Sequence, residues 1–282
     1  MTTNLFNDFN PISSKQWKQK IQFELKGADY NETLVWNSPE DIQVKPFYHK
    51  DEFTKSFPVT TKATAFRICQ NIFVFDIEKS IERALDTLNR GADSLRFTIE
   101  NESIDITNLL EKLPLDNVTV YFNLGFISID FVQKIDAFAK KNNTRIFCNL
   151  DPIGQLAKDG NWFVTKEKNN FETLNLLSKQ TKSVSLLSIN VALYQNAGAN
   201  MVQQIAYSLG QANDYFNRIE TINQPIVFEV AVGTNYFFEI AKLRTLRLLF
   251  NLIAKEYNHT LDCNIIVSPT KRNKTLYDYN VN

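Results

Sequence analysis

The stretch SVSLLSINVALYQNAGANMVQQIAYSLGQANDYF, residues 183–216, holds one complete unit of the fold that the sequence predicts. Residues 183–193 form an apolar run of strand length. From Val202 to Ile219, apolar residues recur every three or four positions, which is the spacing of one helix face. The polar joint between them runs from Tyr194 to Gly198. In a parallel α/β protein, such a joint lies where ligands usually bind.

The same unit recurs along the chain from about residue 64. Six further apolar runs have strand length: FRICQNIFVF (66–75), DSLRFTIE (93–100), NVTVYFNL (117–124), RIFCNL (145–150), PIVFEVAV (225–232) and NIIVSP (264–269). Helical patterns lie between them. Seven strands alternating with six helices predict parallel βαβ units.

The choice between an open sheet and a closed barrel rests on motifs and length. No G-x-G-x-x-G follows any strand, which disfavours a dinucleotide-binding open sheet. A (β/α)₈ barrel needs eight units, whereas only TKRNKTLYDYNVN (270–282) follows the seventh strand. Seven strands would leave two unpaired edges. We therefore expect a TIM (β/α)₈-type barrel that lacks its last βα portion, either because the sequence is part of a longer polypeptide or because something else fills the gap.

Residues 1–63 differ from the rest of the chain. A helix capped by Ser13 or Ser14 is predicted there, with Trp17, Ile21 and Leu25 on one face and Gly27 as its stop. Pro-punctuated sequence follows, with too few apolar residues to enclose a core. We predict an N-terminal arm over 1–63 that packs on the barrel or on a partner subunit, and a barrel domain over 64–282.

Composition narrows the class of partner. Lys plus Arg and Asp plus Glu both total 31 of the 282 residues, so no global charge favours nucleic acid or an anionic membrane. Cys69, Cys148 and Cys263 lie far apart without C-x-x-C spacing, which fits a reducing compartment. The N-terminus has no signal-peptide pattern, and no apolar run reaches about 18 residues. We expect a soluble, cytoplasmic protein.

Polar residues follow the predicted strands at their carboxyl ends, where barrels bind ligands. Four of them are candidate ligand-binding residues at the barrel mouth: Asn149, Asp151, Gln195 and Glu229. The alternative is that strand ends are polar simply because they meet solvent. In Asp151-Pro152-Ile153-Gly154, a turn is favoured over a presented carboxylate.

The sequence contains few residues that would support metal binding, nucleophilic catalysis or phosphate binding. A metal site needs clustered His, Cys or carboxylates, but the only histidines, His49 and His259, are expected at the surface. No G-x-S-x-G or P-loop motif occurs. The charges of Lys242, Arg244 and Arg247 are expected on the solvated face of a helix. The sequence therefore predicts no metal site and no catalytic residue of a recognised type.

Several segments resemble the methylmalonyl-CoA mutase family, and in particular its small, non-catalytic subunits. They are LKGADYNETLVWNSPEDIQVKPFY (25–48), ALDTLNRGADSLRF (84–97), AGANMVQQIAYSLGQANDYF (197–216), VGTNYFFEIAKLRTLRLLF (232–250) and RNKTLYDYNVN (272–282). The resemblance implies a (β/α)₈ barrel whose arm packs on a partner subunit. In catalytic chains of the family, acyl-CoA lies along the barrel axis and a separate C-terminal domain binds adenosylcobalamin.

The resemblance also implies that this chain lacks the family's catalytic side chains. Catalytic chains resemble Tyr-His-x-Gln-x-Ala-Gly-Ala at the joint, and alignment on Gln195 places Leu193 where the substrate-contacting His stands. Leucine cannot donate a hydrogen bond to a thioester carbonyl. In the first strand, Asn71 stands where the catalytic Tyr is expected. The cobalamin-ligand pattern Asp-x-His-x-x-Gly is absent from the sequence, so no cofactor is expected on this chain.

Two functions follow as hypotheses. In the first, the chain is a small subunit in a heterodimer with the catalytic large subunit, which binds adenosylcobalamin and interconverts (R)-methylmalonyl-CoA and succinyl-CoA. In the second, it is an independent barrel that binds an acyl-CoA or another small ligand at its mouth. An incomplete barrel that oligomerises through its open edges is compatible with either.

Overall fold

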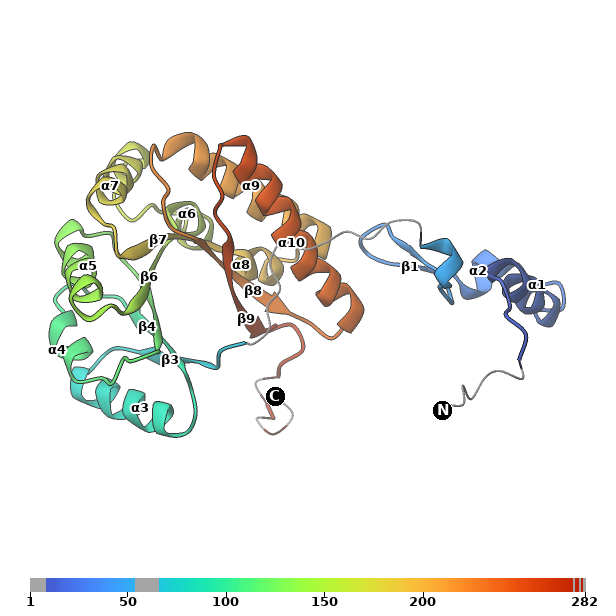
Figure 1. Cartoon of the computed structure of the whole chain (residues 1–282), viewed down its shortest axis with the longest axis horizontal. Coiled ribbons are helices and arrows are strands. Elements are labelled where there is room, and N and C mark those ends of the chain that lie inside the picture. Colours follow the sequence, from blue (N-terminus) through green and yellow to red (C-terminus); the bar gives the residue numbers. More distant parts are fainter. Residues whose placement is uncertain (1–8, 54–65, 276, 279, 281–282) are drawn as a thin grey trace, which may run out of the picture. The chain divides into compact units, whose positions relative to one another are not determined.

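The structure is a computed structural model that describes residues 9–53, 66–275, 277, 278 and 280 (Figure 1). The chain divides into two compact units, Met1–Pro58 and Val59–Asn282. The predicted boundary between 63 and 64 and the boundary after Pro58 both lie outside the described residues. The two units are therefore described separately.

The larger unit is built on seven parallel strands, and each strand pairs with the next along the chain. The strands are β3 (Cys69–Phe73), β4 (Ser94–Ile99), β5 (Thr119–Leu124), β6 (Arg145–Leu150), β7 (Val184–Asn190), β8 (Ile226–Val232) and β9 (Cys263–Pro269). All seven predicted strands are present. Cys69 pairs with Ser94 and Ser94 with Thr119, so the first residues of β3, β4 and β5 are aligned.

The sheet is curled, because side chains of strands that are not neighbours meet across its inner face. The Arg96 guanidinium on β4 lies 2.9 Å from the Glu229 carboxylate on β8. Asn264 on β9 donates a 3.0 Å hydrogen bond to the Tyr121 hydroxyl on β5. The seven strands in sequential order around this curl form an incomplete TIM-type barrel, which confirms the predicted fold class.

Helices cover the outer side of the sheet, where α3, α4, α5 and α7 follow one another (Figure 1). Those described are α3 (Ile77–Asn89), α4 (Ile106–Glu111), α5 (Ile129–Asn142), α6 (Pro152–Asp159), α7 (Glu167–Gln180), α8 (Val191–Asn196), α9 (Met201–Arg218) and α10 (Tyr236–Glu256). Alternate strand residues such as Phe97, Phe122 and Phe228 are fully buried beneath them and form the main core with Ile135 and Phe250. This burial on the helical side is the dominant stabilising term.

Two joints are helical where the sequence predicts strand or turn. Strand β7 ends at Asn190, and the apolar residues 191–193 belong to α8. The Asn190 side chain causes this change, because it accepts a 3.1 Å hydrogen bond from the Leu193 amide and so caps α8. Since α6 and α8 add to the six predicted helices, eight helices are described after residue 66.

The charged residues of α10 also depart from their predicted place. Lys242 is 3% exposed instead of lying on a solvated face. Its ammonium group lies 2.6 Å from the Glu239 carboxylate and donates a 2.7 Å hydrogen bond to the Ala231 carbonyl. Arg247 donates a 3.1 Å hydrogen bond to the Cys263 carbonyl. The helix therefore uses two of these cations to hold the ends of β8 and β9, whereas Arg244 is exposed as predicted.

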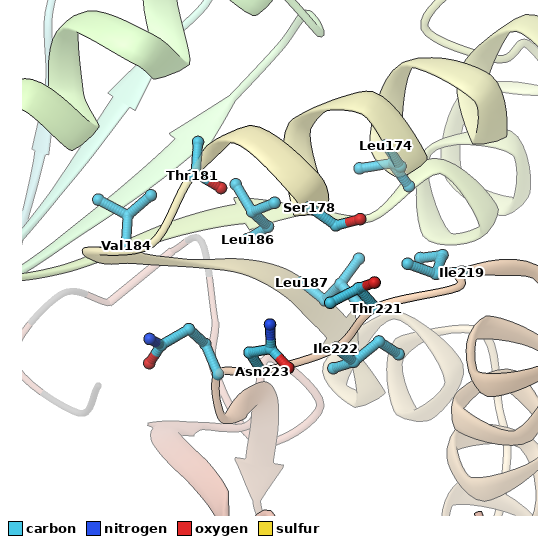
Figure 2. Close-up of a pocket in the computed structure, with 11 residues that line it drawn as sticks. Leu174, Ser178, Thr181, Val184, Leu186, Leu187, Ile219, Thr221, Ile222 and Asn223 are labelled. Carbon is cyan, nitrogen blue, oxygen red and sulfur yellow. The ribbon is translucent and has the colours of Figure 1, made fainter.

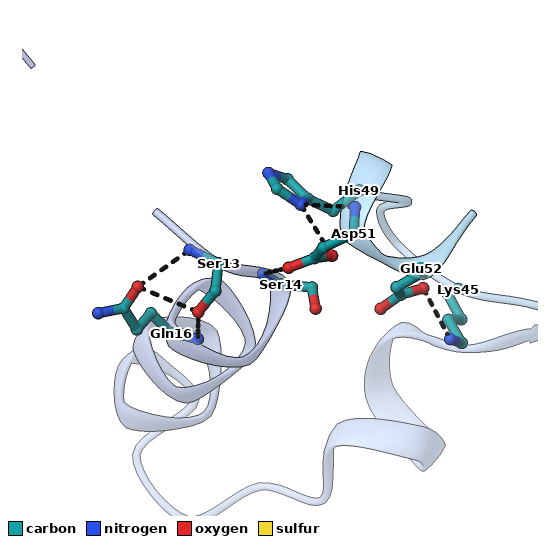
Figure 3. A network of polar contacts seen from close by, with 7 residues as sticks. All are labelled: Ser13, Ser14, Gln16, Lys45, His49, Asp51 and Glu52. Atoms are coloured by element: carbon teal, nitrogen blue, oxygen red, sulfur yellow. Dashed lines mark hydrogen bonds and ion pairs between the residues drawn. The ribbon is translucent and has the colours of Figure 1, made fainter. Parts of the chain in front are cut away.

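The smaller unit contains α1 (Ser14–Glu24), α2 (Tyr30–Leu34), β1 (Trp36–Asn37), β2 (Gln43–Val44) and the 3₁₀ helix η1 (Lys50–Glu52). Ser13 caps α1 as predicted, through a capping box with Gln16. The Asp51 carboxylate accepts a 2.9 Å hydrogen bond from the Ser14 amide and pairs with His49 at 2.8 Å, so η1 is held against the start of α1 (Figure 3). The Ser14 hydrogen bond and the neighbouring His49 lower the pKa of Asp51.

Among the described residues of the smaller unit, only Tyr30 and Ser38 are buried. Phe9, Phe23 and Phe53 are 73%, 79% and 69% exposed. The unit thus has secondary structure but encloses no core among those residues.

Candidate functional site

A network of polar side chains crosses the inside of the curled sheet, from the middle of the strands toward their carboxyl ends. Glu229 on β8 is its centre. Its carboxylate pairs with Arg96 and accepts a 3.0 Å hydrogen bond from Asn149 on β6. Asn149 also donates to Asn123 on β5 at 2.8 Å, and Arg96 donates to Asn71 on β3 at 2.6 Å. Five strands are thereby joined through side chains alone.

Glu229 is a nearly buried carboxyl group, and its surroundings shift its pKa in opposite directions. Burial raises its pKa, while Arg96 and the Asn149 hydrogen bond act to lower it. The net direction is upward, so desolvation outweighs the ion pair. Every oxygen of this carboxylate already has a protein partner. Glu229 is therefore better equipped to fasten strands than to receive a ligand.

Asp151 is the N-cap of α6, which corrects the predicted turn at residues 151–154. Pro152 occupies the first helical position, where its missing N–H costs nothing, and the Asp151 carboxylate accepts a 2.8 Å hydrogen bond from the Gly154 amide. The carboxylate accepts further hydrogen bonds from the Asn190 amide at 2.9 Å, from the Tyr215 hydroxyl at 2.6 Å and from the Gln211 amide. Burial raises the Asp151 pKa in spite of these donors.

Gln195 lies within α8 and is 4% exposed. Its side-chain oxygen accepts a 2.8 Å hydrogen bond from the Thr270 hydroxyl, just beyond β9. Arg272 donates to its backbone carbonyl. Gln195 thus joins the α8 segment to the residues that follow β9.

Three of the four candidate ligand residues line one pocket of about 190 Å³ at the mouth, namely Asn149, Asp151 and Glu229. Gln195 does not line it. Glu100 and Lys158 also contribute to the lining. The Asn149 side-chain oxygen has no hydrogen-bond partner among the described residues, which leaves one buried acceptor at this pocket.

The positions predicted to replace catalytic residues lie apart from this pocket. Leu193 is half-buried in α8, and Asn71 is exposed on β3 with its side-chain oxygen bound to Arg96. Neither residue lines the mouth pocket. That they stand where catalytic chains have His and Tyr stays a prediction.

A second small cavity lies outside the barrel, between α7, β7 and residues 219–224 (Figure 2). Its walls are mostly aliphatic, from Leu174, Val184, Leu187 and Ile222 among others. At about 30 Å³, it has room for a water molecule but not for a metabolite.

Sequence reasoning missed four residues that organise the site: Arg96, Asn190, Gln211 and Tyr215. Arg96 carried a usable signal, because it alternates with Leu95 and Phe97 and must therefore point to the other face of β4. Gln211 and Tyr215 carried a weaker one, since they are four residues apart on the face of α9 that holds Leu209 and Ala212.

No group of three His, Cys, Asp or Glu residues in the described parts of the chain is arranged to hold a metal ion. His259 stacks on Phe216 with 5.3 Å between ring centroids, and His49 belongs to the smaller unit. None of the helices between residues 9 and 53 or after residue 66 is long and apolar enough to span a membrane. The mouth thus offers neither an imidazole nor a metal-binding cluster among the described residues.

Fold and site together define an α/β barrel protein whose mouth residues mostly bond to one another. The methylmalonyl-CoA mutase family model matches residues 99–282, and the chain belongs to that family.

Three relatives illustrate the range of similar proteins. A methylmalonyl-CoA mutase small subunit of Porphyromonas gingivalis is 28% identical over 99% of this chain and 50% of its own length. A methylmalonyl-CoA mutase of Cereibacter sphaeroides is 32% identical over 86% of this chain and 42% of its own. A methylmalonyl-CoA mutase large subunit of Streptomyces virginiae is 22% identical over 87% and 41%. The chain therefore spans about half the length, or less, of these relatives.

Proposed function

We propose that this chain is the arm and barrel portion of a mutase small subunit that supports a catalytic large subunit in a heterodimer. The large subunit binds adenosylcobalamin and interconverts (R)-methylmalonyl-CoA and succinyl-CoA, whereas this chain contributes structure. The similarity to relatives named as small and as large subunits supports a two-subunit arrangement. The complex is cytoplasmic.

The single observation that carries this proposal is the Arg96–Glu229 pair across the inside of the barrel. A chain that binds an extended thioester along its axis needs that space, but here a 2.9 Å ion pair joins β4 to β8 through it. Next to it, Tyr121 and Phe147 stack with 4.9 Å between ring centroids and pack with Val227. These side chains cross the interior between β4, β5, β6 and β8.

The residues at the mouth do not fit a cobalamin site. Cobalamin-binding chains of the family present a histidine in the pattern that this sequence lacks, and both histidines of this chain are engaged elsewhere. No step of the reaction is therefore assigned to this chain. Its N-terminal unit, with Phe9, Phe23 and Phe53 exposed, offers an apolar surface for the large subunit.

The test is reconstitution. The full chain is co-expressed with a large subunit from the same genome, and complex formation and mutase activity are measured for each chain alone and for the pair. We expect a one-to-one complex, activity only where the large subunit is present, and no cobalamin retained by this chain alone. Turnover by this chain without a partner would contradict the proposal.

A second candidate function is binding of an acyl-CoA or another small ligand at the mouth. It is favoured by the 190 Å³ pocket and by the unpartnered Asn149 oxygen. A thermal-shift series with acyl-CoA esters tests it, because a ligand at about 100 times its dissociation constant stabilises the fold by roughly 2.7 kcal/mol. A flat response across the series argues against this function.

A further inference from the structure

The pocket at the barrel mouth contains three hydrogen-bond acceptors that the protein itself does not use. Most of its polar side chains bond to one another. The Glu100 carboxylate, the Asn149 side-chain oxygen and the Ser188 hydroxyl line the pocket but form no hydrogen bond with any described residue. Since each of these oxygens can accept a hydrogen bond, the pocket is suited to a ligand that donates several.

Two of the three acceptors are deeply buried. Asn149 is 6% exposed and Ser188 is 2% exposed. The Asn149 amide nitrogen donates to Asn123 at 2.8 Å and to Glu229 at 3.0 Å, so both of its hydrogens are used and only its oxygen is left for a ligand. A buried polar atom without a partner costs free energy. A bound donor would remove that cost.

The third acceptor, the Glu100 carboxylate, is placed by the glycine opposite it. Glu100 follows the last residue of β4, and Gly125 follows the last residue of β5. The Gly125 amide donates a 2.8 Å hydrogen bond to the Ile99 carbonyl, which holds the two strand ends together. A Cβ built on Gly125 would clash with the Glu100 carboxylate. The missing side chain thus leaves room for a carboxylate at the pocket wall.

The charge of the pocket wall is predominantly negative. Glu229 is compensated by Arg96, but the Asp151 carboxylate has only neutral donors around it, and Glu100 forms no ion pair with a described residue. Lys158 is the one cation among the described lining residues, and it lies 3.5 Å from the exposed carboxylate that follows it in sequence. Burial raises the pKa of Asp151 and of Glu229, and a cation bound beside them would favour their charged forms. The pocket therefore favours a positively charged ligand.

We propose that the mouth pocket binds the ammonium group of a small primary amine, with Glu100 supplying the charge and Asn149 and Ser188 accepting hydrogen bonds. An ammonium group has three donors and no acceptor, which matches three free acceptors. The volume of about 190 Å³ lies below the usual range for drug-sized ligands and limits the amine to a few heavy atoms. This inference rests on the second candidate function, binding of a small ligand at the mouth, and names its chemical class.

The experiment is calorimetric titration of the full chain with propylammonium at neutral pH and low ionic strength. 1-Propanol and propionate are titrated beside it, because they are of similar size but neutral and anionic. We expect saturable binding of propylammonium alone, and we expect added salt to weaken it.

Two variants and a matched control locate the ligand. Glu100→Gln keeps the size of the side chain and removes its charge, and should weaken binding about tenfold or more, the usual worth of a hydrogen bond to a charged group. Ser188→Ala should weaken it about fivefold. Glu102→Gln removes an exposed carboxylate two residues away that does not line the pocket, and should leave binding unchanged. The unfolding midpoint is recorded for each variant, and Ser188→Ala breaks no hydrogen bond to a described residue, so it stays informative if Glu100→Gln perturbs the fold.

The outcomes separate this inference from the functions proposed above. Equal binding of 1-propanol or propionate, or binding of acyl-CoA esters without binding of propylammonium, would overturn the ammonium assignment and leave a ligand site at the mouth. Propylammonium binding that neither Glu100→Gln nor Ser188→Ala weakens would also overturn it. No response to any of these probes would remove the second candidate function as well. The supporting function is judged by reconstitution alone.

Discussion

Asp151 is the residue on which the joint between β6, β7 and α9 depends. Asp151→Ala leaves the Gly154 and Asn190 amides, the Tyr215 hydroxyl and the Gln211 amide without their acceptor. Because buried donors without partners are costly, we expect a loss of about 2–4 kcal/mol in the free energy of unfolding, measured by urea titration. Asp159→Ala, at the exposed end of the same helix, should change it by less than about 0.5 kcal/mol. Equal effects would contradict the structural role.

Substitutions of Arg96 and Glu229 are expected to have coupled effects on the free energy of unfolding. Removing either partner alone strands a nearly buried charge, so Arg96→Met and Glu229→Met should each cost roughly 3 kcal/mol. The double variant should cost less than the sum, with a coupling energy of at least about 1 kcal/mol. Urea titration of the four proteins measures it. Additive costs would show that the two side chains act independently.

The pH dependence of stability gives a second test of Glu229. The pKa of Glu229 is raised in the folded chain above the ordinary 4.5. Between pH 4.5 and the higher folded pKa, the folded state therefore binds more protons than the unfolded state. The stabilising contribution is complete below pH 4.5 and is lost as the pH rises through the folded pKa. The stability advantage of the wild type over Glu229→Gln should therefore shrink from pH 4.5 to pH 7. An advantage that grows over this interval would contradict the upward direction.

At the scale of elements, replacing the glycine before α9 and the glycine within it should have opposite effects on stability. Gly198 has φ of +113°, a conformation that side chains disfavour, whereas Gly210 lies within the helix. A Cβ added at either position would contact no atom within 4 Å outside the adjacent stretch of chain. Gly198→Ala should therefore destabilise the fold by about 1 kcal/mol through strain, and Gly210→Ala should stabilise it by up to about 1 kcal/mol through helix propensity. Urea titration of both checks the signs, and the same sign for both would contradict this account.

The sequence predicts whether a segment is a strand or a helix where burial gives its apolar residues a regular spacing. All seven strands are predicted correctly for that reason. The prediction is wrong where a single polar side chain determines whether a segment is helical. Val191, Ala192 and Leu193 suit strand and helix equally, and only the Asn190 cap selects the helix. Asp-Pro-x-Gly is a usual turn sequence, but here it begins helix α6. The buried Asp151 carboxylate accepts hydrogen bonds from α6, β7 and α9, which the sequence pattern does not reveal. Glu239 and Lys242 have the i, i+3 spacing of an ordinary helical ion pair, but the sequence does not show that both side chains are buried.

At the scale of the molecule, the candidate site could be only partly predicted. The strand-end rule brought Asn149, Asp151 and Glu229 to one pocket, because parallel strands present their carboxyl ends together. The rule does not tell which of these side chains have free hydrogen-bonding capacity. That depends on Arg96, Gln211 and Tyr215, which come from positions up to 133 residues away along the chain.

The division into two units predicts that the barrel folds without the N-terminal unit. Among the described residues, the two hydrophobic clusters contain only residues from Cys69 onward, and no residue between 9 and 53 belongs to either. Deletion of residues 1–58 should therefore leave the barrel folded, with its thermal midpoint within about 4 °C of the full chain, since a 1 kcal/mol change shifts it by roughly 2–4 °C. The same deletion should abolish co-purification with the large subunit if the exposed Phe9, Phe23 and Phe53 contact it. A truncated chain that still co-purifies would place the interface on the barrel, and one that unfolds would show that the smaller unit completes the fold.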